Sequence, residues 1–277
     1  MACRSSRAVT TGALATVAAA GFLIAFAAVA HAQSAAVPNP DSGTPSGTAL
    51  SKSCQPGAAA LAENPPLPSV AAALAQRKTL RVLAMGAAPG RVGRHGATYT
   101  ALIKEMLSRA LNGVPVEVIN RGVSGELASN AAQRMRNEVG LEEPDLVLWQ
   151  VGTNDALAYV PTAEFIAAVA EQIEWLKAHK IDVVLVGLQF TPQAMRDEHY
   201  VEVREALRKL AAEKGVLVLR FYEAMQILNA ASEADLPLTR EFDLNDDGYN
   251  CLAQYVARAI TLGVFGAHLA PRPKPPQ

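Results

Sequence analysis

The sequence has 277 residues, half of them apolar, which suffices for one sizeable buried core and excludes a wholly disordered chain. Its formal net charge is −1. Proteins that bind nucleic acid normally carry a basic surplus or a basic stripe, so we expect no nucleic-acid partner.

The first residues have the pattern of a secretory signal. Arg4 and Arg7 precede an apolar run, and Ala30-His31-Ala32 supplies small residues two apart, as signal peptidase requires. We therefore predict a signal peptide over residues 1–32 and a periplasmic or secreted protein. The apolar run is also long enough to span a membrane, so an uncleaved anchor in contact with the membrane is the alternative.

Proline-rich segments flank the expected domain. Residues 33–66 are rich in Pro, Ser, Gly and Ala and predict a linker, residues 67–265 the folded domain, and residues 266–277 a proline-rich tail. Removal of the signal leaves two cysteines, Cys54 and Cys251, and in an oxidising compartment such a pair favours a disulfide that pins the linker to the domain. Two unpaired buried thiols are the alternative.

Between these ends, short β-branched runs alternate with longer helical patterns, which is typical of a parallel sheet with crossover helices. We predict a three-layer, doubly wound α/β fold with a parallel five-stranded sheet in flavodoxin-like order. Ligands in such folds lie beyond the carboxyl ends of the strands. The expected strands are 80–85, 114–119, 146–151, 183–188 and 216–219, and the expected helices are 98–111, 127–139, 162–179, 197–214 and 247–262.

Two motifs follow the second and third expected strands, and each would more often be a turn or a helix cap if it stood alone. They are N-R-G-V-S-G-E over Asn120–Glu126 and G-T-N-D over Gly152–Asp155. Together, and in these places, they resemble the N-x-G-x-x-G and G-x-N-D blocks of the SGNH (GDSL-type) ester hydrolases. Asn245–Tyr249 is similar to the stretch after that family's catalytic histidine, and the resemblance covers about residues 78–263.

The resemblance implies the SGNH hydrolase fold and an oxyanion hole. Its donors would be the Gly125 backbone N–H, the Asn154 side-chain amide and the backbone N–H of the nucleophile position. Attack on an ester carbonyl builds negative charge on its oxygen, and a preorganised donor aimed at that oxygen is worth roughly 3 kcal/mol. We therefore expect an ester or acetylated carbohydrate as the ligand.

The catalytic positions of the family are altered in this chain. By resemblance, the nucleophile position is Ala88, and residues 81–97 contain no Ser, Thr or Cys that a shifted register could supply. The position of the base is Asp243, and that of the residue that orients the base is Arg240. A methyl group cannot attack a carbonyl, so no catalytic residue is intact.

Other residues are still candidates for catalysis or metal binding. Ser124 is an alternative nucleophile without an evident base, and His95 and His199 lie in loops from which they could reach the cleft. Residues 243–248 match the first half of a calcium loop, but the twelfth position is Gln254 instead of glutamate. We predict no cofactor and no metal.

These observations favour an exported SGNH pseudoenzyme that binds an acylated ligand at an oxyanion-type pocket formed by Ala88, Gly125 and Asn154. An active ester hydrolase with a non-standard site is one alternative. A non-catalytic module that binds a partner protein and keeps only a vestigial cleft is the other.

Overall fold

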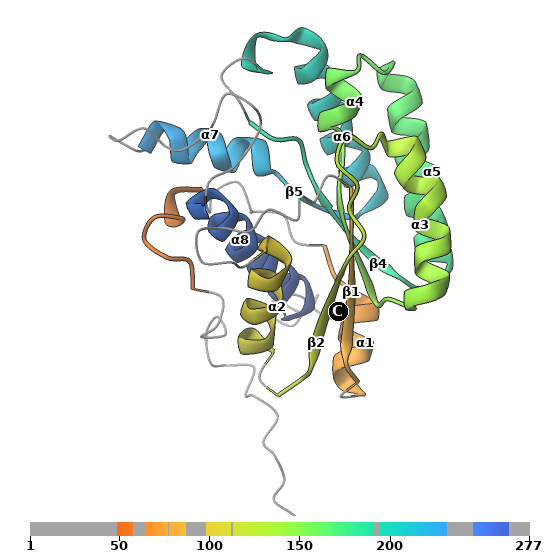
Figure 1. Ribbon diagram of the computed structural model, residues 1–277, viewed down its shortest axis with the longest axis vertical. Coiled ribbons are helices and arrows are strands. Elements are labelled where there is room, and N and C mark those ends of the chain that lie inside the picture. The colour runs from red at the N-terminus through yellow and green to blue at the C-terminus, as the bar shows by residue number, and fades with distance from the viewer. Residues whose placement is uncertain are drawn as a thin grey trace, which may run out of the picture. The chain divides into compact units, whose positions relative to one another are not determined.

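The fold is built on five parallel strands in the order β2-β1-β3-β4-β5, as the sequence predicted (Figure 1). The computed structural model describes residues 49–57, 65–76, 78–86, 98–111, 113–190, 194–231 and 246–265. The inner strands are almost continuously apolar and buried, because helices cover both faces of a parallel sheet. The strands are β1 (Leu80–Gly86), β2 (Val116–Asn120), β3 (Leu146–Gln150), β4 (Asp182–Val186) and β5 (Leu217–Leu219).

Helices form a layer on each side of the sheet (Figure 1). The first layer contains α2 (Tyr99–Ala110) and α8 (Asp246–Phe265), which pack on each other. The second contains α3 (Ala128–Glu142), α5 (Thr162–Ala178) and α6 (Glu198–Lys214). The predicted three-layer α/β architecture is therefore confirmed.

Polar side chains fix where two of these helices begin. Thr98 accepts a hydrogen bond from the Ala101 N–H at the start of α2 (3.2 Å), and Asp197 accepts one from the Tyr200 N–H at the start of α6 (2.9 Å). Both residues occupy the position at which a side-chain oxygen satisfies an otherwise unpaired helix N–H. Each helix starts within one residue of its predicted boundary.

Among the described residues, three α-helices were not predicted: α1 (Pro68–Ala75), α4 (Thr153–Leu157) and α7 (Phe221–Ala231). The expectation that the helix over 247–262 directly follows the fifth strand is wrong, since α7 comes between them. Only Arg220 separates β5 from α7, so the sequence offers no turn signal there. Helix α1 has its N-terminus fixed from outside, because the Asp182 carboxylate accepts the N–H groups of Ser69 and Val70 (2.8 and 2.9 Å).

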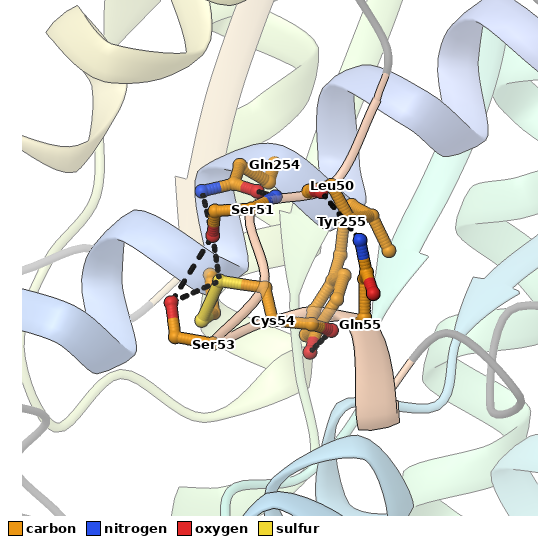
Figure 2. The surroundings of a disulfide bond; sticks show 8 residues. Leu50, Ser51, Ser53, Cys54, Gln55, Gln254 and Tyr255 are labelled. Carbon is orange, nitrogen blue, oxygen red and sulfur yellow. Dashed lines mark hydrogen bonds between the residues drawn. A yellow bond between two sulfur atoms is a disulfide. The ribbon is translucent and has the colours of Figure 1, made fainter.

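A disulfide joins Cys54 to Cys251, as predicted, and fastens residues 50–57 to α8 (Figure 2). The Tyr255 hydroxyl donates to the Cys54 carbonyl oxygen (2.7 Å). Gln254 accepts from the Ser51 N–H (2.7 Å) and donates to the Ser51 hydroxyl (3.1 Å). Part of the segment expected to be a linker thus packs on the domain, and Gln254, the twelfth residue of the calcium-loop alternative, points to Ser51.

Among the described residues, no helix is long and apolar enough to cross a membrane. The predicted signal peptide, the predicted tail and most of the predicted linker lie outside the described residues.

Candidate functional site: an oxyanion-type pocket

The end of β1 forms the floor of the site. Gly86 pairs with Gln150 of β3 and has φ +87°, in the left-handed region. A Cβ atom at this position would lie 1.8 Å from the Gln150 carbonyl oxygen, so only glycine fits there. By the resemblance, Gly86 is the glycine expected at the end of the first strand, two residues before the nucleophile position.

The loop after β2 is fastened to the end of β1. The Arg121 N–H donates to the Ala84 carbonyl (2.8 Å) and the Val123 N–H to the Gly86 carbonyl (2.9 Å). At the tip of this loop Gly125 is exposed, with φ +78°. Within the described part of the chain the Gly125 N–H donates to no backbone acceptor.

Asn154 contacts the same loop from the other side. Its Nδ2 atom donates to the Glu126 carbonyl oxygen at 3.0 Å. A side-chain amide has two N–H groups, so this bond fixes the orientation of the amide and leaves the second N–H for another acceptor. The structure thus brings together the two predicted donors, Gly125 and Asn154, which are 29 residues apart in the sequence.

Asp155 ties the Asn154 helix to α3. Its carboxylate is almost fully buried and accepts the Ala128 N–H at the start of α3 (2.9 Å). Burial raises the pKa of Asp155, and the hydrogen bonds from Ala128 and neighbouring backbone N–H groups oppose that rise. This side chain is directed into the protein, so its role in the G-x-N-D motif is to hold α3 and α4 together.

An ion pair between Glu126 and Arg134 restrains the loop after β2. Both carboxylate oxygens of Glu126 accept from the Arg134 guanidinium, at 2.9 and 2.8 Å, and the Glu126 side chain is only 7% exposed. A planar guanidinium held by two parallel bonds restricts the carboxylate to one geometry. Arg134 therefore restrains the residue whose carbonyl orients Asn154. The sequence motifs give no signal for this pair, because Arg134 lies outside them.

A second set of bonds joins the site to the segment after β4. The Gln189 N–H donates to the Thr153 hydroxyl (3.0 Å), and the Tyr200 hydroxyl donates to the Gln189 carbonyl (2.6 Å). Burial is the main cause that raises the pKa of Tyr200, which keeps its hydroxyl protonated as a donor. These two hydrogen bonds therefore fix the position of Thr153, the residue before Asn154.

The remaining predicted positions divide into two groups. Ala88, His95, Arg240 and Asp243 lie outside the described residues. Ser124 lies in an exposed turn, and His199 stacks on Tyr159 with its Nδ1 atom 4.0 Å from Glu202. Within the described ranges, no three His, Cys, Asp or Glu side chains are grouped to hold a metal ion.

Comparison with known proteins identifies a family and a relative for this chain. Residues 53–265 match the model of the non-GDSL lipase-like family. Esterase TesA of Pseudomonas aeruginosa is 27% identical over 139 residues, which make up 50% of this chain and 67% of that protein.

Solved structures that share the fold include a lipase/acylhydrolase and an esterase. A lipase/acylhydrolase from Enterococcus faecalis is 22% identical, with a TM-score of 0.56, over 66% of this chain and 96% of that one. Axe2, an acetylxylan esterase from Geobacillus stearothermophilus, was solved as a catalytic mutant and is 17% identical. Its TM-score is 0.57, over 66% of this chain and 94% of that one.

Proposed function

This chain belongs to the non-GDSL lipase-like family, within the SGNH/GDSL hydrolases, and from that premise we propose that it is an exported protein that binds an acylated ligand without hydrolysing it efficiently. The carbonyl of the ligand would lie between the Gly125 N–H and the free N–H of Asn154. The single observation that carries this proposal is the bond from Asn154 to the Glu126 carbonyl, which preorganises the amide.

The lack of efficient turnover follows from the identity of the attacking residue. The family position of the nucleophile holds Ala88, that of the base Asp243 and that of its orienting residue Arg240. When a serine protease loses its triad residues, the remaining rate is only about 10³- to 10⁴-fold above the rate in water. This remainder comes from the oxyanion hole and from substrate binding. A site that keeps its donors and lacks its nucleophile holds a carbonyl and releases it unchanged.

An O-acetylated carbohydrate is the proposed ligand class. The Axe2 structure, which shares this fold, is that of an acetylxylan esterase. The disulfide between Cys54 and Cys251 supports export, because such bonds persist in oxidising compartments.

We predict that Asn154→Ala weakens binding of acetylated xylotetraose about tenfold, since the lost amide donates a hydrogen bond to the acetyl carbonyl. Asn154→Asp, which keeps the shape but offers no N–H, is expected to weaken it at least as much. Titration calorimetry with acetylated and deacetylated xylotetraose measures the effect.

The matched control is Asn137→Ala, which removes an exposed amide from α3 and is expected to leave the affinity unchanged. Neither Asn154 variant should alter binding of the deacetylated sugar. If Asn154→Ala binds the acetylated sugar as tightly as the unmodified protein does, the proposed pocket is wrong.

A further inference from the structure

Tyr159 presents an aromatic ring to solvent next to the helix that carries Asn154. The side chain is 64% exposed and follows α4 by two residues. Helix α4 has five residues, so its two ends are separated by roughly 8 Å. Helix α4 and the start of α6 both follow the carboxyl ends of strands, the edge at which the proposed pocket lies (Figure 1).

Two contacts hold the ring in one orientation. The Tyr159 hydroxyl donates to the Oδ2 atom of Asp197 at 2.6 Å. One face of the ring stacks on His199, with ring centroids 5.2 Å apart and planes 15° apart. Asp197 is itself fixed, because its other oxygen accepts the Tyr200 N–H. The ring is therefore restrained before any ligand arrives, which lowers the entropy lost on binding.

The backbone of Tyr159 favours a different residue. Its φ is +53°, its N–H donates to the Ala156 carbonyl (3.1 Å), and the Val160 N–H donates to the Asp155 carbonyl (3.0 Å). This is the Schellman arrangement that ends a helix, and glycine is the residue that suits its left-handed position. The exposed Tyr159 side chain contributes little to the core, so most of its ring surface is accessible to a ligand.

The surroundings of the ring combine apolar groups with carboxylates. The elements that carry Tyr159 and Asp197 also expose Leu157 and Met195, each 48% exposed. The first two turns of α6 add further acidic side chains. A sugar ring offers a face of C–H groups and an edge of hydroxyl donors, which fits an aromatic face beside carboxylate acceptors. The carboxylates near the ring are Asp197, Glu198 and Glu202, and the exposed cation Arg196 precedes Asp197.

From these contacts we propose that Tyr159 is the stacking platform for one sugar ring of the ligand and that Asp197 accepts a hydroxyl of that ring. The inference rests on the proposed function in one respect, that the acyl group lies at Asn154. The separation of the two residues then requires an oligosaccharide, with an acetylated unit at Asn154 and a neighbouring unit on Tyr159.

The test compares Tyr159→Gly, Tyr159→Phe and the unmodified protein by calorimetric titration with acetylated and deacetylated xylotetraose. Tyr159→Gly is expected to weaken binding of both sugars about tenfold, since the platform contacts the ring and not the acetyl group. Tyr159→Phe keeps the ring and is expected to stay within about threefold of the unmodified protein. Leu141→Ala, which truncates a 76% exposed side chain at the far end of α3, is the control and should change neither affinity.

A folding defect is distinguishable, because glycine suits the left-handed position and Tyr159→Gly should keep its Tm within about 3 °C. Unchanged affinity of Tyr159→Gly for both sugars would overturn the platform, as would the absence of binding of either sugar by the unmodified protein. If Tyr159→Gly weakens binding of both sugars while Asn154→Ala weakens binding of neither, the stacking platform is supported and the acyl pocket at Asn154 is wrong.

Discussion

Gly86→Ala is expected to destabilise the protein by more than about 4 kcal/mol, a large part of the total stability of a typical domain. The added Cβ would lie 1.8 Å from the Gln150 carbonyl oxygen, and the backbone there has φ +87°. The backbone cannot shift at low cost to make room, because Gly86 and Gln150 are paired residues of β1 and β3, two of the inner strands of the sheet. Urea denaturation followed by circular dichroism measures the loss.

Gly125→Ala is the matched control for this prediction. Gly125 also has a positive φ, +78°, but no atom lies within 4 Å of the Cβ that alanine would add. We expect a cost of only about 1 kcal/mol, which reflects the left-handed backbone alone. Equal stability of the two alanine variants would contradict the close approach of β1 and β3 at the floor of the site.

Loss of the disulfide is expected to cost about 3 to 5 kcal/mol, because the bond links residues 197 positions apart and restricts the unfolded chain. The double variant Cys54→Ala/Cys251→Ala should therefore unfold at a clearly lower urea concentration than the oxidised protein. Reductant should bring the unmodified protein to the midpoint of the double variant.

The same reductant should leave the double variant unchanged, which is the control for effects on other groups. Residues 50–57 would then be held on α8 by hydrogen bonds alone, chiefly that from Tyr255 to the Cys54 carbonyl. A midpoint of the unmodified protein that does not respond to reduction would show that this crosslink carries no stability.

The sheet and its order followed from the sequence because short apolar runs alternate with helical patterns along the chain. Helices α1 and α7 were missed for a different reason. Helix α1 follows a proline-rich segment and has its N-terminus capped by Asp182, which is more than 100 residues away. Helix α7 follows β5 after a single residue, and local sequence does not mark such a boundary.

For the site, the two predicted donors lie together because their motifs follow neighbouring strands. The groups that hold them could not be found in the same way. The Glu126 carbonyl is a backbone atom that any residue supplies, and Arg134 reaches Glu126 through a pairing that depends on helix placement. Spacing within a motif carries no information about such partners.

The central claim is that the polarising donors persist while the nucleophile and the base do not. The most direct measurement is hydrolysis of p-nitrophenyl acetate by the purified, oxidised protein, with Ala88→Ser/Arg240→Asp/Asp243→His as the restored variant. We predict no burst of p-nitrophenol from the unmodified protein and turnover far below the ~10 s⁻¹ typical of enzymes, with a clear gain in the restored variant. Saturable turnover near that typical value by the unmodified protein, abolished by Asn154→Ala, would contradict the account.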